Sequence, residues 1–469
     1  MMSHPMRVSL TTLAIAIMVP ALSRGQSLDT VAINALFARY VAGNTPGCAI
    51  AIAQNGRTIF QHAYGMADLE RDVPNSVNTV FEAGSVSKQF VAAAVLILAA
   101  HGKLSLDDDI RKWFPELHGL GDLITVRHLL QHTSGLRDWG ALAWLEGWPR
   151  GTRDLSERDV LTIMSRQRTL NHPVGEQFSY TNTGYNLAVL LVERASHESF
   201  PAFTQRELFN PIGMTHTSWR DDYARVVKGR AQAYSVHGKE WELDMPFENA
   251  YGNGGLLTTV ADLLKWNDAL TAHRIGTPDV STTMETPGTL KNGAPMEYGF
   301  GLFIRDVLGV KEIGHDGATA GYRTFLARYP SVIVSTAVLC NAGDANGTAL
   351  GRTAARALLP FTRRAATPVA APASAPAPDA PGAAQLEQFT GTWRSVEIVT
   401  PLQISKGEGS LILERRPGLQ TAARSTATPD QFEGDEGLKL RFERDTQGRV
   451  ARLFVSVPRA LNLPYTRMP

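Results

Sequence analysis

A tract rich in alanine and proline divides this chain into two unequal parts. Residues 364–384 read "RAATPVAAPASAPAPDAPGAA". Repeated prolines without any hydrophobic periodicity are typical of an extended linker, since proline cannot donate a backbone hydrogen bond. A chain of 469 residues that is 43% hydrophobic can form two or three folded units. We therefore expect a large unit before the tract, residues 27–363, and a small one after it, residues 385–469.

The two units carry different patterns. After the tract, short runs such as "LKLRFERD" and "RVARLFVSV" are separated by Gly, Asp and Pro, which predicts a small antiparallel β domain. In the large unit, strand patterns lie at both ends and helical patterns lie between them. The expected strands are a hairpin over 47–65 that turns at "QNG", and strands over 317–330 and 331–340; the expected helices cover 85–102, 181–196 and 258–273. This order predicts an α+β fold, in which an antiparallel sheet from both ends has helices packed on both sides.

The first residues predict export. Arg7 precedes an apolar stretch over 8–22, and small residues follow near Gly25, which is the pattern of a signal peptide over 1–25. The stretch is shorter than the roughly twenty apolar residues of a spanning helix, and no other stretch is long enough. We expect a periplasmic or extracellular protein. Export permits a disulfide between Cys48 and Cys340, but cysteines in apolar strand-like runs are more often small apolar residues, which is the interpretation we favour.

Charge excludes some partners. The formal net charge is +1 and the chain has no block of Lys or Arg, so nothing predicts binding to nucleic acid or to an anionic membrane. A small-molecule substrate is expected, and no feature points to a particular oligomeric state.

Ser85 and Lys88, in "GSVSKQF", are candidates for a nucleophile and its base. Residues i and i+3 share a helix face, so Lys88 can reach the Ser85 hydroxyl. A serine becomes nucleophilic when a neighbour accepts its proton, and burial favours the neutral lysine that can do so. The Ser85 N–H would also be one oxyanion donor. The alternative is a serine that caps a helix beside a solvated lysine.

Proton transfer and substrate orientation need further groups. "FSYTNTGYN" places Tyr180 and Asn182 just ahead of a helix, where ordered elements would hold them. A rival pair, Tyr251 and Asn253, lies in the Gly-rich "AYGNGG", so we favour Tyr180 and Asn182. In the structural alternative, Tyr180 is a packed core residue and Thr181 or Asn182 caps the helix.

His315 and Gly317 form the only His-x-Gly among the 12 histidines. Glycine would let a substrate backbone approach the strand, and the Ala318 N–H would be the second oxyanion donor. A Ser-His-Asp triad with Asp316 is a weaker interpretation because no G-x-S-x-G occurs. His128 and His132 have zincin spacing, but Leu129 stands where the glutamate is needed, so no metal or other cofactor is expected.

These motifs, in this order, resemble the serine β-lactamase and penicillin-binding protein superfamily. The nearest likeness is the branch with class C β-lactamases, D-aminopeptidases, DD-peptidases and related esterases. It covers roughly residues 30–360 and includes "ITVRHLLQHTSGL", "LFNPIGMTHTS", "YGNGGLLTTVADLLKW" and "YGFGL". The tail from "FTGTWRS" resembles a lipocalin-like β-barrel. The resemblance implies an acyl-enzyme on Ser85, with Lys88 and Tyr180 moving protons and Asn182 holding the substrate amide.

One departure from this family pattern bears on the substrate. Classical members have Lys-Thr-Gly where this chain has His315-Asp316-Gly317, so a permanent cation for a substrate carboxylate is replaced by imidazole. An ester or a small D-amino acid peptide amide is therefore favoured over a β-lactam or a DD-peptidase substrate. A catalytically silent binding protein is the alternative from another class. Trp139, with Trp144 and Trp148, would either bind apolar acyl groups at the cleft or pack a lid.

Overall fold

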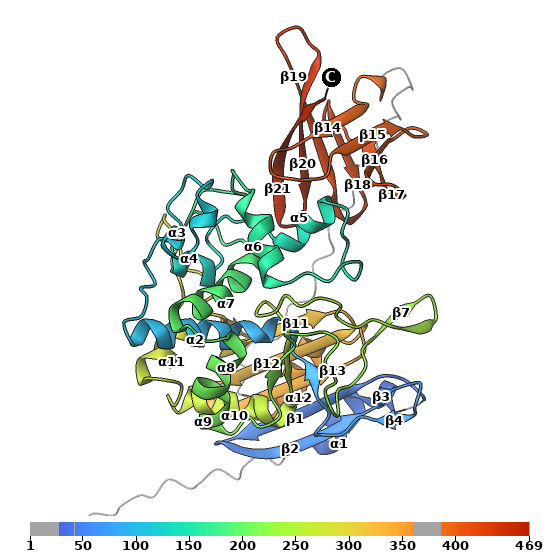
Figure 1. Ribbon diagram of the computed structural model, residues 1–469. Helices are drawn as coiled ribbons and strands as arrows, with labels where there is room; N and C mark the ends of the chain where they lie inside the picture. The colour runs from blue at the N-terminus through green and yellow to red at the C-terminus, as the bar shows by residue number, and fades with distance from the viewer. Residues whose placement is uncertain (1–27, 42, 360–385, 469) are drawn as a thin grey trace, which may run out of the picture.

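The larger part of the computed structural model is built on one antiparallel sheet (Figure 1). The structure describes residues 28–41, 43–359 and 386–468, so the predicted signal peptide and linker lie outside it. Across the sheet the six strands are β10 (Phe303–Val307), β11 (Val310–Thr319), β12 (Tyr322–Tyr329), β13 (Val334–Cys340), β1 (Cys48–Gln54) and β2 (Arg57–Tyr64). Strands from both ends of the large unit therefore meet where β13 pairs with β1. The predicted α+β fold is confirmed.

The turns between these strands agree with the sequence at one hairpin and correct it at another. Asn55 and Gly56, at φ 52° and 73°, turn β1 into β2 as the Asn-Gly pair predicts. The single strand expected over 317–330 is wrong, because the chain turns at Ala320 and Gly321 and this stretch holds the end of β11 and all of β12. An apolar run does not reveal such a reversal when the turn lacks an Asn-Gly pair.

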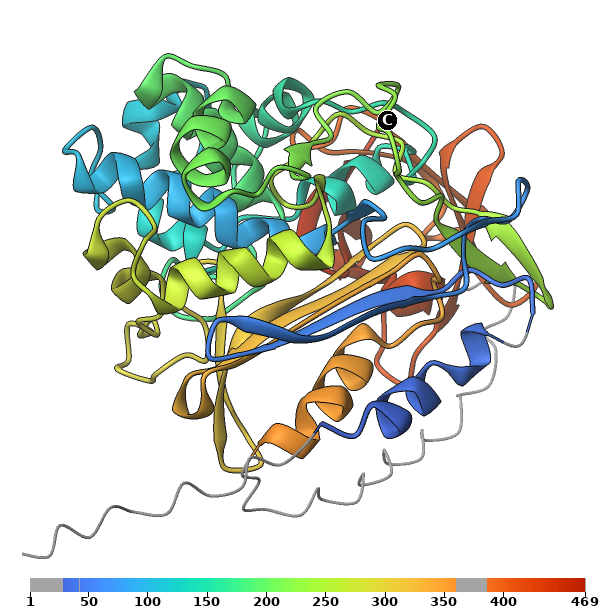
Figure 2. The same ribbon diagram turned by 90° about the horizontal axis from the view of Figure 1, so that it is seen from below.

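Helices cover both faces of the sheet (Figure 2). On one face lie α1 (Thr30–Leu36) and α12 (Gly347–Ala355). On the other, α10 (Val260–Thr271) packs on β13 and β1, and α2 (Lys88–Ala100) packs against α7 (Thr183–Ser196). α2 is buried from Lys88 to Leu98 because it has neighbours on all sides, which explains its apolar sequence. α2 ends where the sequence predicts, because Gly102 follows the helix with its backbone in the left-handed region, at φ 68°.

The other elements of the large unit are short and lie mostly between β2 and β10. The helices are α3 (Ile110–Trp113), α4 (Val126–Leu130), α5 (Trp139–Leu145), α6 (Glu157–Ser165), α8 (Phe200–Thr204), α9 (Asn210–Ile212) and α11 (Pro278–Met284). The strands are β3 (Met66–Asp68), β4 (Val73–Pro74), β5 (Phe81–Glu82), β6 (Ser218–Trp219), β7 (Tyr234–His237), β8 (Glu240–Leu243) and β9 (Leu256–Thr258). No helix in the described ranges is long and apolar enough to cross a membrane.

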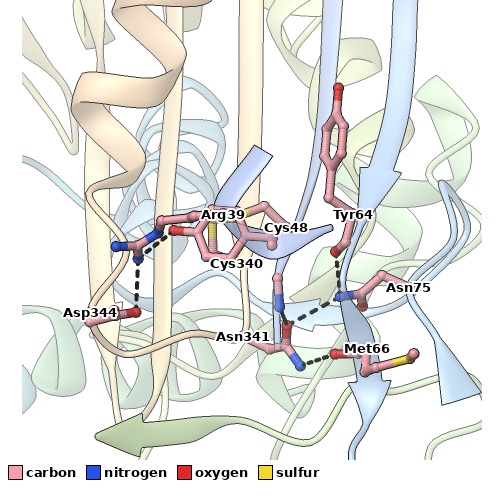
Figure 3. Close-up of a disulfide and its surroundings, with 10 residues drawn as sticks. Arg39, Cys48, Tyr64, Met66, Asn75, Cys340, Asn341 and Asp344 are labelled. Atoms are coloured by element: carbon pink, nitrogen blue, oxygen red, sulfur yellow. Dashed lines mark hydrogen bonds and ion pairs between the residues drawn. A yellow bond between two sulfur atoms is a disulfide. The ribbon is translucent and has the colours of Figure 1, made fainter. Parts of the chain in front are cut away.

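A disulfide joins the first and last strands of the large unit, Cys48 of β1 and Cys340 of β13 (Figure 3). The two cysteines are directly opposite in the register and fully buried. The interpretation of both as small apolar residues is therefore wrong: strand register, which the sequence does not reveal, brings together residues 292 apart. Next to the bridge, Asn341 accepts from the Gly47 N–H at 2.9 Å and donates to the Met66 carbonyl at 2.9 Å, which fixes neighbouring strand ends.

The small unit is a closed antiparallel barrel of eight strands. They are β14 (Gly391–Arg394), β15 (Leu402–Lys406), β16 (Leu411–Arg416), β17 (Leu419–Ser425), β18 (Gln431–Gly434), β19 (Lys439–Arg444), β20 (Val450–Val457) and β21 (Ala460–Arg467). Pairing of β14 with β21 closes the barrel, and fully buried side chains such as Trp393 and Leu453 contribute to its core. The barrel lies against α5 of the large unit (Figure 1).

Candidate active site

Ser85 lies in a 3₁₀ turn, Gly84–Ser87, that leads directly into α2. Gly84 has φ 51°, and a Cβ there would lie 2.9 Å from the Ala318 nitrogen, so glycine is required for β11 to approach this turn. No helix-capping bond from Ser85 is formed, and its Oγ lies 3.1 Å from the Nζ of Lys88. The structure therefore brings the two predicted residues together and disfavours the capping alternative.

Lys88 is fully buried and has only uncharged partners. Its Nζ lies 3.0 Å from the Oδ1 of Asn182 and 2.7 Å from the Asn253 carbonyl oxygen, in addition to Ser85. No carboxylate of the described residues forms an ion pair with it. Burial lowers the pKa of Lys88 well below its usual range, and the more distant charge of Asp138 opposes this shift without cancelling it.

This set of partners suits a neutral amine. A neutral lysine has two N–H donors and one lone pair. The oxygens of Asn182 and Asn253 can only accept, so they take the two donors, and the lone pair then faces the Ser85 hydroxyl. The geometry lets Lys88 accept the serine proton.

Tyr180 lies beside Lys88, where a second proton-transfer group was predicted. The Nζ of Lys88 lies 4.9 Å from the centroid of the Tyr180 ring. The buried hydroxyl of Tyr180 has no hydrogen-bond partner of standard geometry among the described residues. Burial raises the pKa of Tyr180, and the adjacent Ser85 side chain opposes that shift. The phenol therefore keeps its proton at neutral pH and can donate it. Free donors of this kind commonly gain their partner only when substrate binds.

Asn182 does not cap α7 with its side chain, which corrects the alternative that made it a helix cap. Its backbone is helical and its Oδ1 is turned to Lys88, while the Thr181 hydroxyl accepts from the Thr183 N–H at 3.3 Å. Of the rival pair, Tyr251 packs in the core against aromatic neighbours. Asn253 contacts Lys88 through its main-chain carbonyl, which residue type could not have indicated.

β11 passes very close to the Ser85 turn. A Cβ at Gly317 would lie 2.3 Å from the Ala83 oxygen and 3.0 Å from the Ser85 nitrogen. Because a Cβ at Gly84 would meet the Ala318 nitrogen, the main-chain N–H groups of Ser85 and Ala318 belong to the same contact. The two predicted oxyanion donors are thus neighbours, held there by two glycines.

Comparison with known proteins identifies the family. The β-lactamase family model matches residues 33–360. The chain belongs to the β-lactamase family. This is the group of serine hydrolases that its motifs resemble, and the match ends just before the Ala/Pro tract.

Three relatives show how far the likeness extends. Penicillin-binding protein 4* of Bacillus subtilis is 28% identical over 294 residues, 59% of this chain and 64% of that protein. A D-aminopeptidase of Gluconobacter oxydans is 28% identical over 316 residues, 66% of this chain and 58% of that protein. These matches span less than two thirds of either relative. The octameric penicillin-binding protein homologue of Pyrococcus abyssi has a similar fold, with a TM-score of 0.62 at 22% identity over 94% of this chain and 100% of that one.

This β-lactamase family member has an uncharged group at its third motif. His315 is buried among aromatic rings, and its Nδ1 lies 2.5 Å from the Asp316 main-chain oxygen, so the Ser-His-Asp alternative is not formed. Burial, followed by the charge of Lys88, lowers the pKa of His315 to about 4. The imidazole is neutral at pH 7, and it provides no cation for a substrate carboxylate.

We expect His315→Lys to increase acylation by carboxylate-bearing β-lactams by about 10-fold, the effect of one added charge-assisted hydrogen bond. Stopped-flow measurement of nitrocefin acylation gives the rate, and melting curves verify folding. His315→Gln is the matched control, because it is polar without being a cation and should give no gain. An equal rate in both variants would show that the missing charge does not limit β-lactam recognition.

The predicted Trp cluster has two functions in the structure. Trp139, which is buried, begins α5 and lines the cavity at Ser85; its indole N–H donates to the Asn186 Oδ1 at 2.8 Å. Trp144 and Trp148 line the same cavity and also stack under guanidinium groups of the barrel, Arg415 at 3.4 Å and Arg416 at 3.5 Å. The loop therefore forms the cavity wall and holds the barrel; substrate binding by Trp139 stays a prediction.

The cavity at Ser85 measures about 620 Å³ and contains charged groups, of which only Asp316 was considered from the sequence. Its cations are Arg150, Arg153, Arg305 and Arg459, and its carboxylates are Asp138, Glu248 and Asp316. Arg459 comes from the barrel, in the turn before β21, and lies 5.1 Å from the Tyr180 ring centroid. The cavity wall is therefore built by both units.

A buried ion pair holds the barrel in this position. Arg137 and Glu397 are each 1% exposed, and Nη1 lies 2.6 Å from Oε2. Arg137 also donates to the Leu461 carbonyl, and the Arg459 carbonyl accepts from the Asp138 N–H at 3.0 Å. These contacts connect the barrel directly to the segment that enters α5.

We expect Glu397→Ala to lower the free energy of unfolding by about 3–5 kcal/mol, because it leaves Arg137 buried without its counter-charge. Urea unfolding followed by tryptophan fluorescence measures the change. The double variant Arg137→Met with Glu397→Leu is the control, since it removes both charges and should cost much less. A loss below about 1 kcal/mol in the single variant would contradict this assignment.

Proposed function

We propose that this protein is a serine hydrolase that releases D-amino acids or short D-residue products from amides, and that also accepts small esters, through an acyl-enzyme on Ser85. The observation that carries the proposal is the contact of Ser85 with a buried lysine whose other partners are two acceptor oxygens. A lysine with these partners can act as a base, because no structural ion pair holds its charge.

In acylation, the Ser85 Oγ attacks the substrate carbonyl carbon and its proton passes to Lys88. The Ser85 and Ala318 N–H groups bind the oxyanion that forms. When the C–N bond breaks, the leaving amine takes a proton from the Tyr180 hydroxyl, and the Lys88 ammonium returns a proton to Tyr180. The serine proton is thereby delivered to the amine, and the base is neutral again.

In deacylation, water attacks the ester of Ser85. Lys88 and Tyr180 take the water proton and return one to the Ser85 Oγ, so the carboxylic acid is released and the resting site is restored. The low dielectric around Lys88 and Tyr180 favours this exchange, because neither group gains by holding a charge.

The substrate class rests on the neutral third motif and on the relatives. His315 supplies no cation for a carboxylate, which disfavours β-lactam recognition. D-aminopeptidases are among the relatives, 28% identical in the case of Gluconobacter oxydans. Together these support amides of D-amino acids over β-lactams.

The test is an assay of purified protein on D-alanine p-nitroanilide, its L-enantiomer, p-nitrophenyl acetate and nitrocefin, with peptide mass spectrometry after fluorophosphonate treatment. We expect label on Ser85, turnover of the D-anilide and the ester, and slow nitrocefin turnover. Fastest turnover of nitrocefin would identify a β-lactamase. No turnover and no label on Ser85 would identify a binding protein instead.

We also propose that the protein is exported. The buried disulfide between Cys48 and Cys340 supports this, because such bridges persist in oxidising compartments. Mass spectrometry of the protein released by osmotic shock tests export, because the mass shows whether the signal peptide is removed and whether the disulfide is formed. Full-length, reduced protein found only in the cytoplasm would contradict export.

A further inference from the structure

Three carboxylates line the cavity at Ser85, and two of them have evident roles or positions elsewhere. The Oδ2 of Asp138 accepts from the Asn182 N–H at 2.7 Å and its Oδ1 from the Gly140 N–H at 3.0 Å, so Asp138 holds two helix starts. Asp316 is exposed to solvent next to His315. Glu248 is the one that needs an explanation.

The Glu248 side chain is 14% exposed, and its carboxylate accepts no hydrogen bond from the described residues. Its one ion-pair contact within 4 Å among the described residues is with Arg220, whose Nη2 is 3.8 Å from Oε1. Arg220 is already paired with the buried Glu82, Nε to Oε2 at 2.9 Å, and it also donates to the Glu248 main-chain carbonyl. A nearly buried carboxylate with so little compensation is costly in the free enzyme, and a cationic ligand would compensate it.

The position of Glu248 along the cavity indicates which part of a substrate it would meet. The leaving amine must reach Tyr180, so the end with Tyr180 and His315 is the leaving-group end. β11 runs from His315 past the oxyanion donor to Thr319, which marks the opposite, acyl end. There Arg150 donates to the Thr319 hydroxyl at 2.7 Å, and Arg150 and Glu248 line the same cavity. Burial raises the pKa of Glu248, and the charge of Arg150 opposes this shift ahead of that of Arg220, which places Glu248 on the Arg150 side of the cavity.

We propose that Glu248 binds the free α-ammonium group of the residue whose carbonyl is attacked by Ser85. This inference rests on the proposed function. In an N-terminal residue the ammonium is one carbon from the scissile carbonyl, on the acyl side, where Glu248 lies. Arg150 is exposed, is turned to Thr319 and forms no ion pair with Glu248 in the described ranges, so the carboxylate is available. Glu248 thereby selects substrates with a free amino terminus.

The decisive comparison is between D-alanine p-nitroanilide and its N-acetyl derivative, which lacks the ammonium charge. We expect the wild-type protein to prefer the free amine, and Glu248→Gln to reduce the ratio of the two kcat/KM values by about 10- to 100-fold, the contribution of a charge-assisted hydrogen bond. The variant keeps size and shape. Glu242→Gln, which changes a carboxylate 63% exposed on β8, is the matched control and should leave the ratio unchanged.

A second measurement separates this inference from the proposed function. D-alanine amide and N-acetyl-D-alanine amide are tested as inhibitors of p-nitrophenyl acetate hydrolysis. If the protein cleaves no D-amide but only the free amine inhibits, and does so less in Glu248→Gln, the proposed function fails and the ammonium site stands. If D-amides are cleaved with the same free-amine preference in Glu248→Gln, the site is overturned and the function stands. The ammonium site is also overturned if Asp316→Asn loses the preference for the free amine while Glu248→Gln keeps it.

Discussion

Ser85→Ala is expected to reduce kcat for D-alanine p-nitroanilide by about 10⁶-fold, the order of the loss when a serine hydrolase loses its nucleophile. The Oγ contacts Lys88 and lies next to Tyr180, both groups of the site, and the turn that carries it is held by Gly84 and by the neighbouring strand. Folding should therefore be unaffected, and the residual rate should be that of a site with binding and oxyanion donors alone. Steady-state assays with the anilide and the ester measure the loss.

The control for this variant is Ser87→Ala, two residues further along the same turn. The Ser87 hydroxyl accepts from the Leu256 N–H at 3.1 Å and faces away from Lys88. Removing it should lower stability by about 1 kcal/mol and leave an active nucleophile. Equal activity in Ser85→Ala and the wild-type protein would end the acyl-enzyme mechanism, whichever substrate is used.

The parts of the site that lie near each other in the chain could be predicted from the sequence. Ser85 and Lys88 are three residues apart, so the spacing allowed their contact, although a helix cap beside a solvated lysine was the alternative. Tyr180, Asn182 and His315 could be proposed because their motifs occur in a familiar order, although nothing in the spacing fixes how they meet. The departure at His315 was also visible, but its pKa of about 4 depends on burial that only the fold supplies.

The other groups of the site depend on contacts that a sequence does not reveal. The Asn253 carbonyl is a main-chain atom, so its residue type carries no signal. Arg459 reaches the cavity across two units, and Glu248 lies in a loop without regular structure. The disulfide was predicted wrongly for the same reason, since the register of β1 against β13 sets which residues face each other. Regular elements could be predicted; register, domain docking and loop placement could not.

Barrel docking gives the small unit a direct influence on chemistry. Arg137 and Asp138 are adjacent in the chain: the first is paired with Glu397 of the barrel, and the second holds the Asn182 N–H. Asn182 in turn contacts Lys88 at 3.0 Å. A displacement of the barrel would therefore reach the base through three residues, Arg137, Asp138 and Asn182, and through the two hydrogen bonds of Asn182. We therefore expect docking and turnover to respond together.

Lys88→Met is expected to lower kcat by about 10³-fold while it raises stability. The thioether keeps the length of the side chain but cannot accept the Ser85 proton. Because burial lowers the pKa of Lys88 well below its usual range, the amine holds a proton less readily in the folded protein than in the unfolded chain, where it is protonated at pH 7. The unfolded state then binds more protons, so this group costs stability at neutral pH, and the cost falls as pH rises toward the ordinary lysine range. Methionine removes that cost.

Two measurements test this together. In the wild-type protein kcat should fall as pH is lowered, when Lys88 becomes protonated, and this acidic limb should be absent from the residual activity of Lys88→Met. Urea unfolding should show the variant to be more stable at pH 7, with the difference shrinking at higher pH. Lys88→Arg keeps a cation that cannot be deprotonated, so it should be as inactive as the methionine variant. High activity in Lys88→Arg would mean that residue 88 serves as a fixed positive charge, and the base would have to be Tyr180.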